Sequence, residues 1–410
     1  MSCCEPPLAL AYLRSLLSRR HDIDVHPTGA LDRETPPEDM YLYRPSELLV
    51  PVEQIELFAA AAKRLDIRFW RLDEPSTDRR PQTIARFAIG TNAPLDTVID
   101  RLVRAADGRL RVSPNHVLLT CPVWGFSPSG EPSVATEIPT LKNDGAAWDV
   151  TVAVIDSGLP EGFAANNLLA EVDVAPGDEE QWPYSGPHPV LTFPQGHGSF
   201  VAGVVRLAAP QAQVRSYLAA DQDGVMDEWY LGEQIALALA DGPSVVNLSL
   251  GATSRHDEAL MGLTGLQAAA SAEGGPIVVA AAGNLDSDRP FWPAAESWVI
   301  AVGAAELIGD PPTPTRAWFS DFGTWVDVCA VGVDVVSAYE SHPYRPMLDP
   351  SQLRYFHGGA IWSGTSFATP QVAAAVAALR AADPGLTRQQ ALSQFAVSGV
   401  DVPGIGTFVP

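Results

Sequence analysis

Short apolar runs alternate with helix-like segments from residue 149 to residue 330. The first run, 151–155, is uninterrupted and ends in Asp156-Ser157-Gly158. Such a run is typical of a strand buried in a parallel sheet, because helices cover both faces of that sheet. The alternation predicts an α/β domain with a doubly wound, mostly parallel sheet. The expected strands are 151–155, 213–219, 245–250, 277–282, 298–303 and 325–330, and the expected helices are 200–208, 228–240 and 258–272.

A further helix is expected after Ser363-Gly364-Thr365-Ser366. Val372, Val376 and Leu379 recur at the 3.6-residue period of a helix, with alanines between them. Proline is tolerated in the first turn of a helix, so we expect Pro370 to lie there. Ser366 would then lie at the N-terminal end, where free N–H groups and the helix dipole point. A serine there is commonly an N-cap, so a nucleophile would need partners upstream.

The first part of the chain has a different pattern. Strand-like runs at 41–43, 67–72, 84–89 and 116–121 surround two helical segments, 52–65 and 95–106. The order βαβ–βαβ is that of a small α+β, ferredoxin-like domain. Residues 1–40 form an N-terminal extension with one possible helix at 8–19, and residues 123–148 have the proline-rich composition of a linker. The larger domain would span 149–410.

Charge and hydropathy exclude several classes of partner. The net charge of −23 argues against nucleic acid and against anionic membranes, because phosphate groups are bound by clustered Lys and Arg. No stretch of 18 apolar residues is present, so no membrane span is expected. The positive charges near the N-terminus follow the apolar run at 8–17, whereas a secretory signal carries them before it. We therefore expect a cytoplasmic protein.

The sequence does not indicate a metal site. Cys3, Cys4, Cys121 and Cys329 form no CxxC pair and have no histidine at zinc-ligand spacing. The most acidic run could bind a cation, although a solvated loop is the commoner explanation for such a run. Its residues are Glu171, Asp173, Asp178, Glu179 and Glu180. We expect no cofactor, and structural calcium is possible but not indicated.

Three polar residues follow predicted strands or begin a predicted helix in the larger domain. Asp156 closes the first strand, His197 lies between two glycines before a helix of small residues, and Asn284 follows the run 280–283. In an open parallel sheet, reactive groups gather at the carboxyl ends of the strands. Each of these residues alone is more often structural than catalytic. Asp156, His197 and Ser366 together have the chain order of a subtilisin-type triad.

The surrounding motifs strengthen this similarity. They are VAVIDSG at 152–158, GHGSFVAG at 196–203, VNLSLG at 246–251, AAGN at 281–284 and GTSFATP at 364–370. With these motifs, the chain resembles the subtilisin-like serine peptidases, or subtilases, over residues 149–400. The resemblance implies a subtilisin-like fold and peptide-bond hydrolysis.

The resemblance also implies a role for each matching residue. Ser366 would be the nucleophile, and His197 would take its proton and pass it to the leaving amine. Asp156 would orient the imidazole, and the Asn284 side chain with the Ser366 N–H would form the oxyanion hole. Ser249, Leu250 and Gly251 would pair with an extended peptide.

The first specificity pocket is also implied by the resemblance. Ala281, Ala282 and Gly283 would form its wall, and Phe291 would shorten it and favour small substrate side chains. A long loop at 338–360 precedes the nucleophile. Its His342, Tyr344, Tyr355 and His357 could border the site, although a solvated insertion is the simpler explanation.

We therefore expect a serine endopeptidase that acts on few protein or peptide substrates. Family propeptides share the topology expected for 41–122 and cap the active site, so this region would be propeptide-like or inhibitory; a retained docking module is the alternative. An activating or target protein partner is possible. A catalytically silent peptide-binding protein is the second hypothesis, and a secreted protease is a third.

Overall fold

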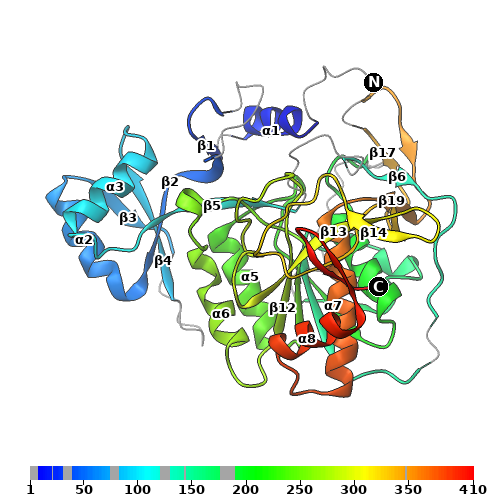
Figure 1. The fold of residues 1–410 in the computed structure, drawn as a ribbon. Coiled ribbons are helices and arrows are strands. Elements are labelled where there is room, and N and C mark those ends of the chain that lie inside the picture. The colour runs from blue at the N-terminus through cyan, green and yellow to red at the C-terminus, as the bar shows by residue number, and fades with distance from the viewer. Residues whose placement is uncertain are drawn as a thin grey trace.

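The computed structural model describes residues 8–20, 22–30, 39–73, 83–120, 130–142, 145–175, 190–346 and 349–410. Three of the four cysteines and three residues of the acidic run therefore lie outside the described residues: Cys3, Cys4, Cys121, Asp178, Glu179 and Glu180. A smaller N-terminal unit lies beside a larger α/β body (Figure 1).

A large sheet forms the centre of the α/β body. Ten strands of the described chain belong to it, in the order β20-β21-β15-β13-β12-β11-β7-β9-β8, with β14 paired to β13. The pairs from β8 to β21 are parallel, and β13/β14 and β20/β21 are antiparallel. The predicted mostly parallel sheet is confirmed. Its strands are β7 (Thr151–Asp156), β8 (Val172–Val174), β9 (Gln213–Leu218), β11 (Val245–Leu248), β12 (Ile277–Ala281), β13 (Val299–Ile308), β14 (Thr313–Arg316), β15 (Val328–Val331), β20 (Val400–Val402) and β21 (Gly406–Phe408).

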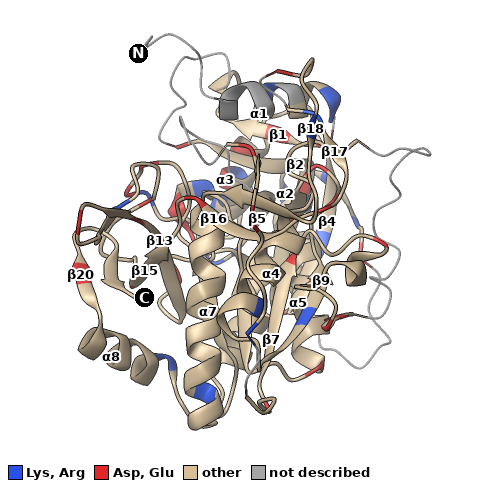
Figure 2. Ribbon diagram, turned by 90° about the vertical axis from the view of Figure 1, so that its right-hand side faces the viewer, with Lys and Arg blue, Asp and Glu red and all other residues tan. Residues whose placement is uncertain are grey.

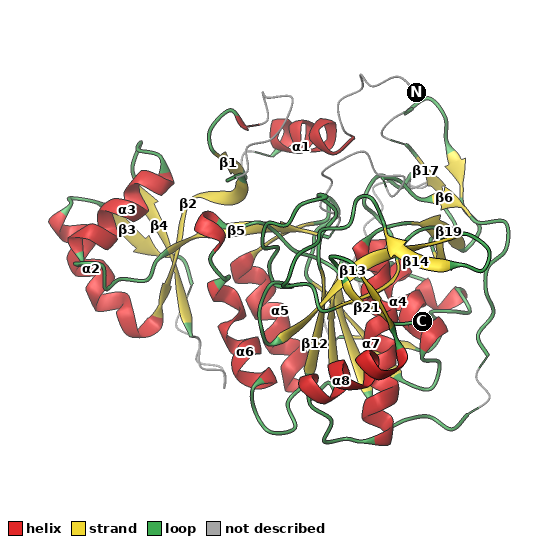
Figure 3. Ribbon diagram, in the orientation of Figure 1, coloured by secondary structure: helices red, strands yellow, loops and turns green. Residues whose placement is uncertain are grey.

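Helices cover both faces of this sheet (Figure 3). Successive residues of a strand point to opposite faces, which divides the core in two. Val152 and Val154 pack with α4 (His197–Ala208) and α7 (Thr365–Ala382), whereas Ala153 and Ile155 pack with α5 (Glu228–Ala240) and α6 (Thr264–Ala270). The strands are uninterrupted apolar runs because helices cover both faces of the sheet, as the sequence predicted.

Several element bounds differ from prediction. The expected helix 258–272 is a 3-10 turn, Met261–Leu263, followed by the short α6, Thr264–Ala270. The strand expected at 298–303 continues to Ile308, because β14 pairs with its second half. The C-terminal region adds α8 (Arg388–Ser398), which begins with a capping box formed by Thr387 and Gln390.

The N-terminal unit contains an antiparallel sheet covered by two helices. Its strands are β2 (Tyr41–Pro51), β3 (Arg68–Arg71), β4 (Ile84–Gly90) and β5 (Ser113–Leu119), and its helices are α2 (Ile55–Arg64) and α3 (Leu95–Ala105). The order along the chain agrees with the expected βαβ–βαβ order, although β2 is longer than expected and β5 begins and ends earlier. The spatial order is β5-β2-β4-β3. Phe58, Val98 and Leu102 pack the helices onto the sheet.

The two parts of the molecule share a sheet. Strand β10 (Val225–Asp227) of the α/β body pairs antiparallel with β5, so the N-terminal sheet continues into the larger domain. Before this unit lie α1 (Leu8–Arg19) and β1 (Asp24–His26), and β1 pairs with β2.

Part of the expected linker is structured. Residues Ser133–Val134 form β6, which pairs with β19 (Gly359–Trp362), and β19 pairs with β16 (Val335–Ala338). Two short strands, β17 (Pro343–Tyr344) and β18 (Arg354–Tyr355), make a hairpin in the loop before α7. The described part of segment 123–148 therefore packs onto the loop 338–360.

Charged residues lie mainly outside the core elements. In Figure 2 most of α7 and of the large sheet is free of acidic and basic residues. Within the described ranges, none of the helices combines the length and the apolar character needed to cross a membrane.

Candidate active site

A buried carboxylate–imidazole pair lies at the carboxyl end of β7. Asp156 is the last residue of that strand and His197 is the first residue of α4, and both side chains are fully buried. The distance from His197 Nδ1 to Asp156 Oδ1 is 2.8 Å. An ionised carboxylate only accepts hydrogen bonds, so Nδ1 carries the proton and Nε2 keeps its lone pair. The imidazole is therefore prepared to act as a base through Nε2.

Glycine at position 198 permits this approach. A Cβ atom on Gly198 would lie 2.4 Å from the carbonyl oxygen of Gly158, in the loop that follows Asp156. The N–H of Gly198 donates to Ser157 Oγ at 2.9 Å. The first turn of α4 thus lies against the end of β7, which explains the glycine after His197.

The imidazole also contacts the start of α7. The ring of His197 lies 5.3 Å from that of Phe367 and 5.7 Å from that of Trp362, centroid to centroid. Phe367 directly follows Ser366, so His197 and its partner Asp156 lie beside the turn of α7 that contains Ser366. The sequence predicted this grouping from motifs that lie 210 residues apart at their extremes, from Asp156 to Ser366.

Ser366 is the second residue of α7, and it is 2% exposed. The expectation that Pro370 lies in the first turn was wrong: the helix begins at Thr365, so Pro370 is its sixth residue. Proline has no N–H, and the carbonyl of residue 366 therefore lacks its usual helical donor. The hydroxyl of Ser249 donates to that carbonyl at 2.8 Å instead. Ser249 thus fixes the backbone of the predicted nucleophile.

Asn284 is held by the residue before Ser366. Its Oδ1 accepts hydrogen bonds from the N–H of Thr365 at 2.9 Å and from Thr365 Oγ1 at 3.0 Å. With Oδ1 occupied, the amide NH₂ is the part of the side chain left to donate to another group. This orientation is the one that a donor to an oxyanion requires.

A strand of the N-terminal unit lies against the predicted peptide-binding residues. Leu119 and Gly251 exchange two backbone hydrogen bonds, each 3.2 Å long. On the other side, the N–H of Thr120 donates to Gly224 O at 3.0 Å. The carbonyl oxygen of Thr120 lies 3.3 Å from Ser366 Oγ. Residues 117–120 therefore run between β10 and the segment 249–251, as an extended peptide would.

Phe291 lies between Gly251 of the predicted peptide-pairing segment and Gly283 of the predicted pocket wall. A Cβ atom on Gly251 would meet Phe291 Cε1 at 2.2 Å, and one on Gly283 would meet Phe291 Cγ at 3.1 Å. The ring is 2% exposed. Ala281 ends β12 and Ala282 follows it, and both are buried. Leu250 is fully buried.

Sequence reasoning missed three positions near the site. Thr365 contacts Asn284, Trp362 contacts His197, and Asp321 holds the loop after Asn284 with hydrogen bonds to Leu285 and Ser287. Asp321 is fully buried, and burial raises its pKa well above the usual range of an aspartate. A signal for Thr365 existed in its position inside the GTSFATP motif, whereas the contacts of Trp362 and Asp321 depend on tertiary packing.

The aromatic and histidine residues of loop 338–360 lie in three different environments. Tyr344 is fully buried and Tyr355 is 58% exposed, while His342 and His357 line a separate pocket beside Tyr339.

Over the ranges that the structure describes, no group of three His, Cys, Asp or Glu side chains is placed to hold a metal ion. Glu171 makes an ion pair with Arg206 at 2.5 Å.

Comparison with known proteins agrees with this geometry. The family model described as the Subtilase family (Peptidase_S8) matches residues 148–400. The thermophilic serine proteinase of Bacillus sp. (strain AK1) is 30% identical over 282 residues, which are 64% of this chain and 61% of that protein. Thermitase of Thermoactinomyces vulgaris is 27% identical over 282 residues, which are 64% of this chain and 87% of thermitase.

A solved structure has a similar fold. Fervidolysin from Fervidobacterium pennivorans, a keratinolytic enzyme related to subtilisin, superposes with a TM-score of 0.61 at 19% identity, covering 90% of this chain and 60% of fervidolysin. The matched family model covers more than half of the chain, and the motifs predicted from the sequence lie within the match. This chain belongs to the subtilase family.

Proposed function

We propose that this protein is a serine endopeptidase that hydrolyses peptide bonds through an acyl-enzyme intermediate. The observation that carries the proposal is the buried Asp156–His197 hydrogen bond beside the first turn of α7, which contains Ser366. Named protease relatives support it. A carboxylate, an imidazole and a serine in this relation are sufficient for nucleophilic attack on a carbonyl group.

The chemistry follows from the proton positions. Ser366 Oγ bonds to the carbonyl carbon of the substrate while its proton moves to His197 Nε2. Asp156 accepts from Nδ1–H and stabilises the resulting imidazolium. His197 then gives the proton to the amine, which leaves as the C–N bond breaks. Water repeats the sequence and releases the acyl group as a carboxylic acid.

The negative charge that forms on the carbonyl oxygen requires donors. We assign this role to the Asn284 amide NH₂ and the backbone N–H of Ser366. Thr365 holds Asn284 through Oδ1, so the donor orientation exists before the substrate binds. Loss of one such donor typically costs about 3–4 kcal/mol of transition-state stabilisation.

The substrate backbone would occupy the place now held by residues 117–120. Gly251 offers an N–H and a carbonyl to a neighbouring strand, and here both are bonded to Leu119. A substrate strand can make the same two bonds only after Leu119 leaves. We propose that Phe291, between Gly251 and Gly283, restricts the first specificity pocket to small side chains.

We further propose that the N-terminal unit is a ferredoxin-like, propeptide-like gate. Its strand order β5-β2-β4-β3 and its βαβ–βαβ chain order fit that arrangement. The fold similarity to fervidolysin covers 90% of this chain. It therefore extends beyond residues 123–410 into the N-terminal part. A gate that must open limits the number of protein substrates, and a protein partner that opens it would be the activator. Cytoplasmic location stays a prediction from the sequence.

Active-site labelling tests the proposed activity. A fluorophosphonate probe forms a covalent bond only with an activated serine, so it should label the wild type and not the Ser366→Ala variant. Because residues 117–120 block the site, labelling is measured on the full chain and after mild proteolysis of the N-terminal unit. Absence of labelling in both forms would contradict the peptidase proposal.

The alternative is a catalytically silent protein that binds peptides by strand addition. The Leu119–Gly251 pairing favours it, since that pairing is itself strand addition. Under this alternative a peptide displaces residues 117–120 and stays intact. Mass spectrometry of a peptide mixture incubated with the opened wild type separates the two, because only a peptidase changes the masses.

A further inference from the structure

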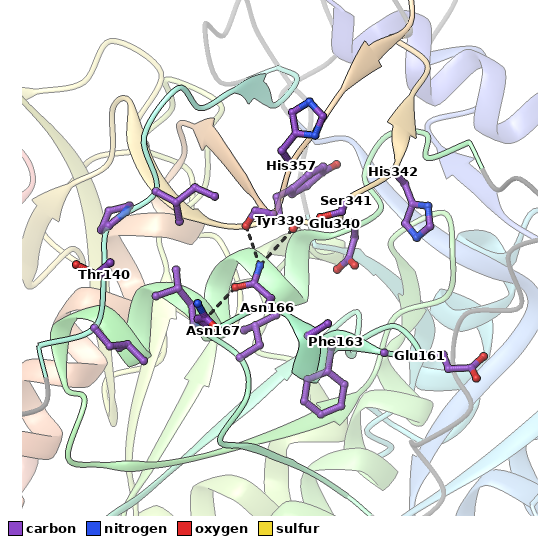
Figure 4. Close-up of a pocket in the computed structure, with 18 residues that line it drawn as sticks. Thr140, Glu161, Phe163, Asn166, Asn167, Tyr339, Glu340, Ser341, His342 and His357 are labelled. Carbon is purple, nitrogen blue, oxygen red and sulfur yellow. Dashed lines mark hydrogen bonds between the residues drawn. The ribbon is translucent and has the colours of Figure 1, made fainter.

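A pocket of about 590 Å³ lies outside the catalytic residues, under the loop that precedes β17. Figure 4 shows its residues: Tyr339, Glu340, Ser341 and His342 from one side, and the segment that contains Phe163, Asn166 and Asn167 from the other. Its volume lies in the range of sites for small molecules, which is about 300–1,000 Å³. The pocket is therefore large enough for an organic ligand.

The side chains around the pocket carry negative rather than positive charge. Among the described residues that line it, two carry carboxylates, Glu161 and Glu340, and none is a lysine or an arginine. The remaining titratable groups that face it are His342, His357 and Tyr339. Burial lowers the pKa of His342, which favours the uncharged form of that ring. An anion would thus find no fixed positive charge here.

Glu340 is the buried member of the carboxylate pair. It is 9% exposed, and its Oε1 accepts a hydrogen bond from Ser199 Oγ at 2.6 Å. In Figure 4 its carboxylate points into the space between Asn166 and His342, above Phe163, while Glu161 lies at the margin. A buried carboxylate with one neutral donor is under-satisfied, and a cation restores the balance best.

Apolar side chains surround the same space. Phe163, Leu168, Leu169 and Leu141 line the walls. Asn166 makes the floor rigid, because its Nδ2 donates to Gly358 O at 2.7 Å and to Tyr339 O at 3.4 Å. The pocket thus offers a buried acceptor group, Glu340, beside apolar side chains on part of its wall. That combination matches a ligand with one charged end and an apolar body.

A metal ion fits this arrangement less well. In the part of the chain that the structure describes, no three His, Cys, Asp or Glu side chains are placed to ligate one ion. An ammonium group needs fewer charged ligands, since it donates hydrogen bonds to single oxygen atoms. We propose that this pocket binds a primary alkylammonium ligand, with its charged group on Glu340 and its apolar body against Phe163 and Leu168.

The pocket is joined to the catalytic helix. Ser199, which donates to Glu340, lies two residues after His197 in α4. Tyr339 donates through its hydroxyl to Gln195 O at 2.8 Å, and its ring lies where a Cβ atom on Gly196 would be, 2.6 Å from Cε2. A ligand on Glu340 would therefore lie next to Ser199 of α4 and next to Tyr339, which contacts Gln195 and Gly196 directly before His197. Binding itself does not depend on the proposed peptidase activity.

The test uses the full chain with Ser366→Ala, so that no self-digestion occurs. Isothermal titration at pH 8 compares phenethylammonium with neutral 2-phenylethanol, which has the same ring and stem. We expect the amine to bind at least tenfold more tightly than the alcohol. Glu340→Gln should weaken amine binding at least tenfold, whereas the matched control Glu161→Gln should change it less than threefold.

The ammonium group could belong to a free small-molecule amine or to a lysine side chain of a protein. Nα-acetyl-lysine amide imitates the lysine side chain. Comparison of its affinity with that of phenethylammonium shows which of the two the pocket prefers. Equal binding of the amine and the alcohol overturns the proposal, and so does the absence of amine binding. These comparisons use the Glu340-containing protein, so they hold even if Glu340→Gln fails to fold.

Discussion

Asp321 Oδ1 accepts a hydrogen bond from the backbone N–H of Leu285 at 2.7 Å, which fixes the loop directly after Asn284. The same oxygen accepts from Ser287 N at 3.0 Å. Its other oxygen, Oδ2, is buried and has no hydrogen-bond partner among the described residues. A carboxylate in this position would be strongly destabilised, so burial raises the pKa of Asp321 well above its usual range. Asp321 therefore positions the loop that follows Asn284, the proposed oxyanion donor.

Asp321→Asn should preserve this loop, because an amide oxygen accepts the same two hydrogen bonds without a charge. As pH rises through the raised pKa of Asp321, the wild type gains a buried charge and its activity should fall. The variant should show no such fall, because its amide does not titrate. The measurement is kcat/KM against pH, and Asp321→Leu, which accepts neither bond, should lower kcat by about 10²-fold or more. An identical fall of activity with pH in wild type and Asp321→Asn would contradict this role.

His116 should control how firmly the N-terminal unit is held. Its Nδ1 lies 2.7 Å from Glu228 Oε2, both side chains are buried, and its Nε2 accepts from Arg255 N at 3.1 Å. Removing one partner of a buried pair leaves a charge uncompensated and costs about 3–5 kcal/mol.

His116→Ala should therefore release the unit more often and raise the activity of the full chain toward a small peptide ester. Arg109→Ala changes an exposed side chain of the same unit and serves as the control. Unchanged activity in a folded His116→Ala protein would show that the unit does not limit access.

Incubation at neutral pH should shorten the wild type and leave Ser366→Ala whole. The reason is the 3.3 Å distance between Thr120 O and Ser366 Oγ, which places the chain itself at the predicted nucleophile. Intact mass spectrometry should show loss of a fragment that ends between Thr120 and the end of the predicted linker, 123–148. If both proteins keep their full-length masses, the N-terminal unit stays attached and an external event opens the site.

Phe291→Ala should widen the specificity of the protein. The ring fills the space between Gly251 and Gly283, so its removal makes room for a larger substrate side chain. We expect kcat/KM to rise for substrates with Phe before the cleaved bond and to fall for those with Ala. Loss of a buried phenylalanine also destabilises by about 3–5 kcal/mol, so thermal unfolding must be measured alongside. An unchanged order of preference would remove Phe291 from the pocket.

Local patterns predicted the parallel sheet and the three candidate catalytic residues, because both depend on short stretches of sequence. The apolar run 151–155 indicates a buried strand, and the glycines on both sides of His197 indicate close packing there. Pairing across the chain was beyond such reasoning: the donation from Ser249 to Ser366 O depends on where β11 and α7 meet, and the Leu119–Gly251 bridge depends on how two units dock. Pro370 misled the prediction because Ser249 supplies the hydrogen bond that proline inside a helix cannot give to the carbonyl of residue 366.

The stability of the protein should depend on pH through Glu340. Burial raises the pKa of Glu340 to about 7 from an ordinary value of 4.5, so the folded state holds a proton that the unfolded state releases. The resulting stability is fully present below pH 4.5 and is lost as pH rises to about 7. The total change is on the order of 3 kcal/mol.

Glu340→Gln removes this dependence, because glutamine still accepts from Ser199 Oγ and does not titrate. We compare the free energies of unfolding of two proteins, Ser366→Ala alone and Ser366→Ala with Glu340→Gln. The value for the first minus that for the second should fall between pH 4.5 and pH 7 and stay constant at higher pH. Urea unfolding at pH 5, 6, 7 and 8 measures the difference. Glu161→Gln, at the exposed margin, should give a curve parallel to the wild type. A difference that does not vary with pH would mean that Glu340 is ionised in the folded protein, with a cation already compensating it.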